Sequence, residues 1–365
     1  MSLVVTTYFL GIGAGQMFWG LLSDRYGRRP VLISGLVLYG LGAAGSAVSG
    51  NITMLLIARA VWGFGAAAPS VLRNSIARDI YSGDRLARIT SVTMAIFLIG
   101  PAIAPSVGEL ILLGGSWRYV FATAVPLAVL GIHWTLRFGE TLNPAHVRPI
   151  SARTFAGGVR IFFGSRTTLG FTLSMMFASG AFFIYLGSGQ PVIDEIYGLG
   201  GWFALLFAGT AASIATTVLA GSRLISRYGA HNVGGVASAA TVAVASSFLG
   251  VALVGDGRPP FWFWYVAVTA FASFTTVTTP AFAALAMTPM ARVAGVASGM
   301  NGLLVIGGGS LLAAIVDRRI ADSVTPMAVG FLAYSIAAFA AMAWARGGSA
   351  EVLDPEPEKR PARSV

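Results

Sequence analysis

The eleven residues Gly20–Pro30, "GLLSDRYGRRP", place a cluster of charge between two long apolar runs. Four charged residues fall within six positions, namely Asp24, Arg25, Arg28 and Arg29. Gly27 lies inside the cluster, and glycine permits the tight reversal that joins two antiparallel helices. The stretch therefore predicts a helical hairpin with a charged turn.

The composition indicates the environment of these helices. Of the 365 residues, 56% are hydrophobic and only 10% are charged, and the mean hydropathy is +0.76. A typical soluble domain carries about 25% charged residues, so this chain has too little polar surface to cover itself in water. Uncharged apolar runs of more than about 18 residues are typical of membrane spans. The chain is therefore predicted to cross a membrane several times.

Eleven apolar runs are long enough to be such spans. They cover residues 3–22, 31–49, 53–77, 89–113, 117–137, 167–187, 200–220, 232–254, 261–286, 293–316 and 326–345. All are expected to be helices, because a lipid-exposed backbone must hydrogen-bond within its own segment. The 46 glycines would let these helices approach closely. The predicted fold class is an all-α membrane protein.

The distribution of positive charge predicts the orientation in the membrane. If the Gly27 turn lies in the cytoplasm, eighteen of the 24 Lys and Arg residues fall on that side and four on the other, while Arg59 and Arg73 lie inside spans. Cytoplasmic loops carry such an excess of Lys and Arg. We therefore expect a multi-pass protein of the bacterial cytoplasmic membrane, with its N-terminus outside and its C-terminus inside. The net charge of +10 then needs no nucleic-acid partner.

The residue inventory argues against several other functions. The chain has no cysteine, which excludes disulfides, iron–sulfur clusters and thiol chemistry. Its three histidines are scattered without neighbouring carboxylates, so no metal site is expected. No span or loop combines a nucleophile with a base, so an enzyme is not expected either. We predict no cofactor.

Two segments are predicted to lie outside the membrane. Residues 138–166 form a basic, proline-containing cytoplasmic loop that separates an N-terminal bundle, 1–137, from a C-terminal bundle, 167–345. Residues 346–365 form a polar cytoplasmic tail rich in proline and charge, and such a composition favours disorder.

The charged turn has an echo in the second half. Leu224–His231, "LISRYGAH", repeats "LLSDRYGRR", and Gly229 follows Gly27 at an offset of 202 residues. Both copies fall on the same side of the membrane, which indicates a parallel repeat. Two spans precede the second copy in its half, but only one precedes the first. We therefore expect five plus six helices, with the first helix of a six-plus-six repeat absent, through either a misplaced start or a true truncation.

The charged turn in this setting resembles the loop signature of the major facilitator superfamily. Further stretches resemble its bicyclomycin-resistance branch of drug:proton antiporters: "ARAVWGFGAAAPSV", "NSIARDIYSGDRLARITSV", "GPAIAPSVGELIL", "SWRYVFA", "GETLNP", "IYLGSGQPVIDEIYGL" and "AGVASGMNGLL". The resemblance extends from Met1 to about residue 345. It implies two pseudo-symmetric helical bundles that exchange a small molecule for protons by alternating access.

The resemblance also assigns a role to the charged turn. A cytoplasmic latch would comprise Gly20, Asp24, Arg25, Gly27, Arg28 and Arg29. Asp24 would meet the positive N-terminal end of a later helix near Arg292–Gly295, a contact worth roughly 0.3–1 kcal/mol. Such a contact is weak enough to break in each transport cycle. The second copy has Ser226 where the first has Asp24, so a weaker latch is expected there.

Two residues are candidates for proton coupling. Arg59 lies within an apolar span, which costs about 2.5–3.5 kcal/mol, and the resemblance links it to proton coupling; the alternative is an arginine that extends to the outer interface. Glu109 is the one carboxylate inside a predicted span. Helix rise places it about 31 Å beyond Arg88, at the outer rim of the membrane, and we favour this position over a proton carrier. Arg73 is expected to extend to the cytoplasmic interface.

A hinge and a substrate cavity complete the predicted sites. Gly100, Pro101, Pro105 and Gly108 resemble an antiporter signature, in which prolines bend the helix and glycines allow close approach. A cavity for a lipophilic or cationic drug would use the side chains of Phe97, Phe177, Phe182, Phe183, Tyr185 and Gln190. For any single aromatic residue, packing or lipid contact is the favoured interpretation.

The predicted function is therefore a monomeric, proton-coupled exporter of drugs or other small molecules. One alternative keeps the fold but exports a metabolite, such as a sugar or an amino acid. Another is a truncated, transport-inactive chain that acts only by pairing with another membrane protein.

Overall fold

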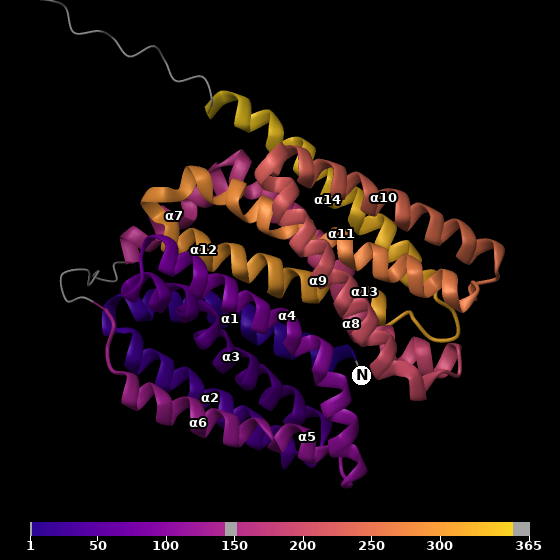
Figure 1. Cartoon of the computed structure of the whole chain (residues 1–365), viewed down its shortest axis with the longest axis horizontal. Helices are drawn as coiled ribbons and strands as arrows, with labels where there is room; N and C mark the ends of the chain where they lie inside the picture. The colour runs from indigo at the N-terminus through magenta and orange to yellow at the C-terminus, as the bar shows by residue number, and fades with distance from the viewer. Residues whose placement is uncertain (1, 143–151, 353–365) are drawn as a thin grey trace, which may run out of the picture.

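The computed structural model describes residues 2–142 and 152–352. In these ranges the regular structure is helical throughout, and most helices are long and run side by side (Figure 1). The first bundle contains α1 (Ser2–Tyr26), α2 (Arg28–Ala47), α3 (Ile52–Ile80), α4 (Gly83–Leu113), α5 (Arg118–Ala122) and α6 (Ala124–Phe138). The second contains α8 (Arg166–Pro191), α9 (Phe203–Tyr228), α10 (Ala230–Val254), α11 (Phe261–Met287), α12 (Ala294–Gly302), α13 (Gly309–Asp317) and α14 (Thr325–Val352).

Each predicted span coincides with one of these helices or with a broken pair of them. The short helix α5 continues into α6, and α12 continues into α13 through a π-helical turn, η5 (Leu303–Gly308). Over the described ranges, eight helical segments are long and apolar enough to cross a membrane, and one of them, Phe261–Asp317, has 57 residues and contains two passes. The all-α membrane fold is confirmed.

The two bundles follow the same plan. Helix α2 packs on α3 and α6, and helix α10 packs in the same way on α11 and α14. The turns that precede α2 and α10 also match, because Gly27 has φ 98° and ψ 161° and Gly229 has φ 81° and ψ 153°. These angles lie in a region that is essentially restricted to glycine. The repeat seen in the sequence therefore corresponds to the same turn between equivalent helices.

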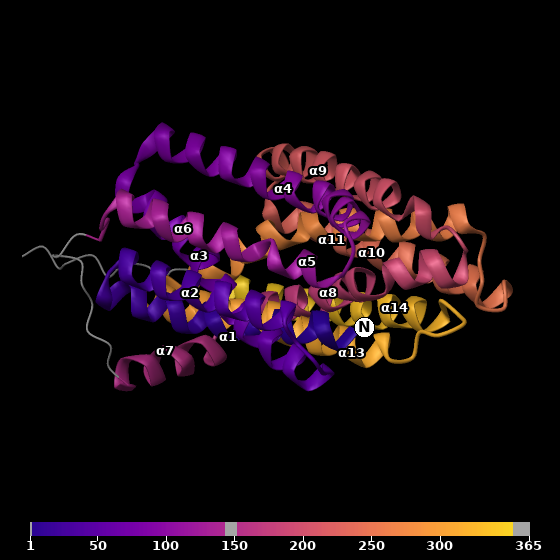
Figure 2. The ribbon, with the colours of Figure 1, turned by 90° about the horizontal axis from the view of Figure 1, so that it is seen from below.

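The bundles differ in one place. Helix α8 packs against α11, α13 and α14 in the second bundle. In the first bundle, the described chain places no helix at the equivalent position beside α3, α4 and α6. Helix α4 instead lies mainly along α9 of the second bundle (Figure 2). Among the described residues, the first bundle thus contains five of the predicted spans and the second contains six.

Close helix packing in the first bundle depends on glycine. A Cβ atom on Gly11 of α1 would lie 2.8 Å from the backbone nitrogen of Phe64 in α3, and a Cβ on Gly63 would collide with the carbonyl group of Tyr8.

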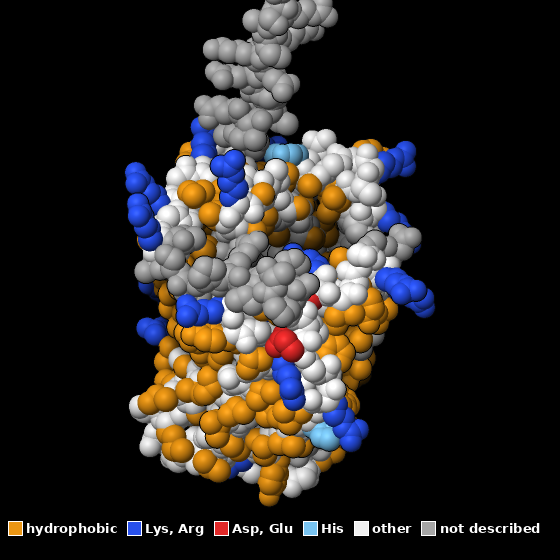
Figure 3. All heavy atoms as spheres, turned by 90° about the vertical axis from the view of Figure 1, so that its left-hand side faces the viewer, with side chains coloured by type: hydrophobic (Ala, Val, Ile, Leu, Met, Phe, Trp, Pro, Cys, Tyr) orange, Lys and Arg blue, Asp and Glu red, His pale blue; other side chains and the backbone are white. Residues whose placement is uncertain are grey.

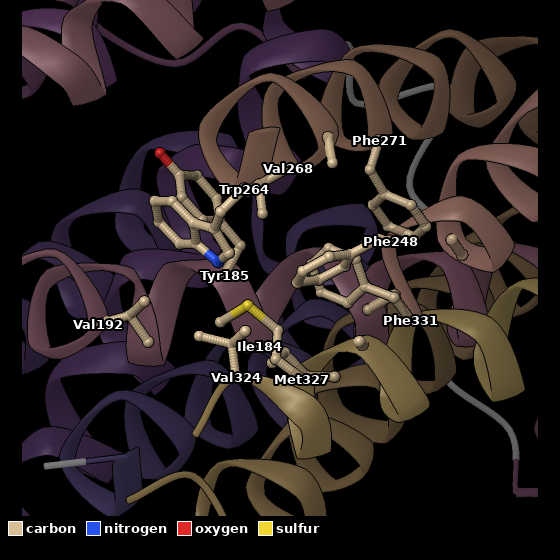
Figure 4. Packing of buried hydrophobic residues seen from close by; sticks show 14 of the residues in the cluster. Ile184, Tyr185, Val192, Phe248, Trp264, Val268, Phe271, Val324, Met327 and Phe331 are labelled. Atoms are coloured by element: carbon tan, nitrogen blue, oxygen red, sulfur yellow. The ribbon is translucent and has the colours of Figure 1, made fainter. Parts of the chain in front are cut away.

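The second bundle is held by large aromatic side chains (Figure 4), and the rings of Phe271 and Phe331 stack at 4.2 Å.

The two bundles meet along α1. This helix packs against α12, η5 and α13, and at the crossing a Cβ on Gly13 would lie 2.8 Å from the nitrogen of Gly307. Phe9 of α1 stacks on Phe183 of α8 at 4.4 Å. The π-helical turn η5 lies at this crossing, and such turns occur frequently at functional sites.

Two predicted boundaries differ from the structure. The segment predicted as a loop contains a helix, α7 (Ala152–Gly164), whose Phe155, Val159 and Phe162 side chains pack on the cluster around Met300. Residues 143–151 lie outside the described residues. Helix α14 continues to Val352, beyond the predicted start of the tail at 346, because its last turns extend the span without a break. The rest of the tail, 353–365, also lies outside the described part.

Candidate functional site

The end of the molecule that carries the Gly27 and Gly229 turns is called the basic end here, and the opposite end is called the far end. Figure 3 looks onto the basic end and shows Arg side chains around its rim. The predicted latch residues lie at this end.

Arg28 is the centre of an ionic network that joins three helices. Its Nη1 atom lies 2.6 Å from Asp24 Oδ1 in α1 and also donates to the hydroxyl of Ser23, at 2.8 Å. Its Nε atom lies 3.0 Å from Asp79 Oδ2 in α3. The Arg28 side chain is only 10% exposed, against 36% for Asp24 and 20% for Asp79. One largely buried guanidinium therefore holds two carboxylates that would otherwise repel each other.

A third carboxylate holds the turn from the other side. Oε1 of Glu140 accepts hydrogen bonds from the backbone N–H groups of Arg28 at 2.8 Å, Thr141 at 2.9 Å and Leu142 at 2.8 Å, and Oε2 accepts from the N–H of Arg29 at 3.0 Å. Glu140 thus caps the first turn of α2, where backbone N–H groups lack partners within the helix. Burial acts to raise the pKa of Glu140, but the four N–H groups together outweigh it, and the pKa is lowered.

This lowered pKa predicts a pH dependence of stability. The charged form of Glu140 stabilises the fold fully above the ordinary pKa of 4.5, and this contribution is lost as the pH falls from there through the lower pKa of the folded state. Glu140→Gln is expected to cost about 0.5–1 kcal/mol at neutral pH, because the site is largely exposed and water screens it. Thermal unfolding of the purified protein at a series of pH values would measure this difference.

The difference between the wild type and Glu140→Gln should be constant near neutral pH and should disappear in acid below 4.5. Glu109→Gln, on an exposed part of α4, is the matched control and should show no such difference. A Glu140→Gln deficit that persists unchanged in acid would contradict the cap.

A polar cavity of about 830 Å³ opens beside the network. Its wall includes Asp24 and Arg28, together with Gln16 of α1, Arg73 of α3 and Ser298 of α12. It therefore lies across the boundary between the bundles. Asp24 Oδ2 lies 3.7 Å from the position that a Cβ on Gly295 would occupy, in the first turn of α12. The structure thus places the Asp24 carboxylate beside the helix start to which the resemblance assigned it.

The remaining latch residues have distinct surroundings. Arg29 donates from Nη2 to the carbonyl of Leu136 at 3.0 Å, and so ties the turn to α6. The Arg25 guanidinium is exposed and lies over the ring of Tyr26 at 5.4 Å. A Cβ on Gly20 would approach Val71 of α3 to 3.7 Å, an ordinary contact.

The second turn lacks this network. Ser226, which replaces Asp24, donates to the carbonyl of Arg223 in its own helix at 2.8 Å. Ala230 and His231 stand where the first turn has Arg28 and Arg29, and Arg346 of α14 donates to the carbonyl of His231. No ion pair occurs at this turn among the described residues. Within the described residues, the Gly27 turn is therefore held by ion pairs and the Gly229 turn is not.

Arg59 lies in an aromatic enclosure. Its guanidinium faces three rings, those of Tyr8 at 4.4 Å, Trp62 at 5.0 Å and Phe121 at 5.6 Å. Its Nε atom donates to the carbonyl of Val4 at 3.1 Å. In the part of the chain that the structure describes, Arg59 forms no ion pair with a carboxylate. Cation–π contacts and one carbonyl therefore hold this charge among α1, α3 and α5.

The predicted hinge runs through an unbroken helix. Helix α4 continues through Gly100, Pro105 and Gly108, and a Cβ on either glycine would meet no atom within 4 Å. The close helix approach expected at these glycines is therefore absent here, because α4 has little packing inside its own bundle. The side chain of Pro101 lies outside the described residues. Glu109 is exposed near the end of α4.

The predicted substrate residues that the structure describes have different surroundings. Tyr185 is 4% exposed and belongs to the aromatic core (Figure 4). Its ring stacks on that of Phe207 at 6.0 Å. Phe177 packs against Tyr334 with ring centroids 6.3 Å apart, and Gln190 is exposed at the end of α8. The Phe97 side chain is outside the described residues. The large cavity lies instead at the basic end and is polar.

The architecture and the site define a class of protein, a polytopic membrane protein of two related bundles with a polar cavity at their boundary. Comparison with known proteins agrees with this class. The sequence profile of the Major Facilitator Superfamily matches residues 1–314. The chain belongs to this superfamily of membrane transporters.

Individual members of the superfamily match this chain at low sequence identity. The chain is 32% identical to the uncharacterized MFS-type transporter YdgK of Bacillus subtilis over 63% of this chain and 57% of that protein. It is 26% identical to the bicyclomycin resistance protein homolog of Haemophilus influenzae over 72% of this chain and 66% of that protein. The matches thus span less than two thirds of these relatives. The fold resembles an inward-open structure of the xylose transporter XylE from E. coli, with a TM-score of 0.69 at 15% identity, over 94% and 86% of the two chains.

Proposed function

We propose that this protein exports small lipophilic molecules, drugs among them, across the bacterial cytoplasmic membrane in exchange for protons. The similarity to a protein named for bicyclomycin resistance supports the substrate class. The protein works as a monomer, the proton gradient is its energy source, and it needs no cofactor. The basic end faces the cytoplasm, because cytoplasmic surfaces carry the excess of Lys and Arg.

The observation that carries this proposal is the position of Asp24 at the boundary between the bundles. Arg28, which is itself paired with Asp79, anchors this carboxylate within the first bundle. Its Oδ2 atom faces the first turn of α12 in the second bundle, where partial positive charge is available. An attraction of roughly 0.3–1 kcal/mol closes the basic end but breaks when the bundles rock apart. Alternating access needs such a reversible contact at the cytoplasmic face.

Expression in a drug-sensitive bacterial strain tests the function. We expect raised minimum inhibitory concentrations for more than one lipophilic drug, and lower cellular accumulation of a fluorescent one. An uncoupler that collapses the proton gradient should abolish both effects. Cells with an equal membrane level of Arg28→Ala should resemble cells without the protein.

The outcome also separates the alternatives. Protection against a single compound would indicate a metabolite exporter of the same fold. No protection, with the protein present in the membrane at full level, would contradict export and favour a transport-inactive chain.

A further inference from the structure

A carboxylate is buried at the far end of the molecule, away from the latch. Asp317 is the last residue of α13 and is 9% exposed. Its Oδ1 atom accepts a hydrogen bond from the hydroxyl of Ser188 in α8 at 2.6 Å. Its Oδ2 atom lies 2.6 Å from the position that a Cβ on Gly187 would occupy. The carboxyl group therefore occupies a niche in α8 that only glycine leaves open.

The niche offers little to balance a negative charge. Within the described ranges, no Lys, Arg or His lies within the 4.0 Å ion-pair distance of Asp317. Arg318 and Arg319, the next residues, are exposed, and Arg319 donates to the carbonyl of Ile315. The phenol of Tyr334 in α14 interacts electrostatically with Asp317 and donates its proton to the carbonyl of Leu312.

The geometry suits a carboxylic acid better than a carboxylate. Burial removes the water that would solvate the charge, and the position at the carboxyl end of α13 opposes the negative end of that helix. A carboxylate can accept about four hydrogen bonds, but Ser188 supplies one. A proton on Oδ2 removes the charge and leaves Oδ1 free to accept from Ser188. A proton bound to Oδ2 would lie against α8.

Asp317 also lies close to the contact between the two bundles at the far end. Helix α1 packs against α13 and touches α8, and the Phe9–Phe183 stack joins the bundles there. Helix α13 has nine residues, and the π-helical turn η5 separates it from α12. A π-helical turn of the same kind, Val192–Ile196, follows α8. A short helix beside an irregular turn can shift as a unit more easily than one held in a continuous helix.

We propose that Asp317 is a proton-binding site that controls closure of the far end. A proton from water at the far end forms an O–H bond on Oδ2, and α13 then packs on α8. Return of that proton to water leaves a charge that draws water into the niche and separates α13 from α8. The use of this step for antiport rests on the function proposed above, but proton binding and closure do not.

Spin labels can report this closure, because the chain contains no native cysteine. Val48→Cys and Val254→Cys place labels on exposed positions at the far ends of α2 and α10, one in each bundle. Pulsed dipolar spectroscopy in nanodiscs, without substrate, measures the label separation at a series of pH values. We expect a shorter separation in acid and a longer one in alkali. Asp317→Asn, which cannot ionise, should keep the acid distribution at every pH.

Two further variants keep the test decisive. Ser188→Ala removes the hydrogen bond to the charged form, so the midpoint of the change should move to higher pH. Asp322→Asn alters an exposed acid at the same end and should leave the profile unchanged. An unaltered pH response in Asp317→Asn, or no response in the wild type, would overturn the inference. Failure of drug export with this response intact would contradict only the proposed function.

Discussion

Arg28→Ala should abolish most of the transport activity and destabilise the protein by about 2–3 kcal/mol. The substitution leaves Asp24 and Asp79 without their common cation, and two partly enclosed carboxylates then repel each other. Asp24 also loses the anchor that holds it beside Gly295. We expect at least about a tenfold loss of proton-driven uptake into inverted vesicles, since 1.4 kcal/mol corresponds to a factor of ten. Uptake and thermal unfolding are the measurements.

Arg25→Ala is the matched control, because it removes an arginine three positions away in the same motif. Arg25 is exposed and stacks only on Tyr26, so its loss should change stability by less than about 0.5 kcal/mol. Equal effects of the two substitutions would show that the motif acts through its total charge and not through the network around Arg28.

Gly27→Ala should destabilise the protein strongly, through both its backbone and the Glu140 contact. The backbone at Gly27 lies in a region that costs any other residue about 1–3 kcal/mol. The new Cβ would also lie 2.5 Å from Oε2 of Glu140 and displace the carboxylate that accepts four backbone N–H groups. The lost hydrogen bonds add about 1–3 kcal/mol. Thermal unfolding of the purified variant gives the total.

Gly229→Ala provides the comparison within the same chain. Its turn has similar angles, but a Cβ there would meet no atom within 4 Å. Gly229→Ala should therefore lose stability only through its backbone conformation. Its free energy of unfolding should stay about 1–3 kcal/mol above that of Gly27→Ala. If the two alanine variants are equally unstable, the Glu140 contact contributes nothing.

The spans and turns could be predicted from the sequence because their causes are local. Apolar runs of the right length, and a glycine between charges, determine a helical hairpin wherever the rest of the chain lies. The partners of Arg28 depend on tertiary packing instead, since Asp79 and Glu140 are 51 and 112 residues distant. Both residues stand in stretches that resembled the superfamily, but spacing alone could not bring them to the turn.

The cavity residues show the same limit. The spacing of aromatic residues within a span does not distinguish a face that lines a cavity from a face that packs against other helices. Tyr185, which was predicted to line the cavity, belongs to the buried core. Asp317 lies one residue beyond a predicted span and so was not considered as a buried acid. Helix α7 was missed although Phe155, Val159 and Phe162 follow a helical period, because charge and proline dominated the loop around it.

Two pairs of spin labels would test the rocking of the bundles most directly. Tyr26→Cys and Tyr228→Cys mark equivalent, exposed positions of the two turns at the basic end, and Val48→Cys with Val254→Cys marks the far end. Alternating access predicts that, as pH and substrate are varied, the basic-end separation increases whenever the far-end separation decreases. Two separations that stay constant, or that rise and fall together, would contradict it.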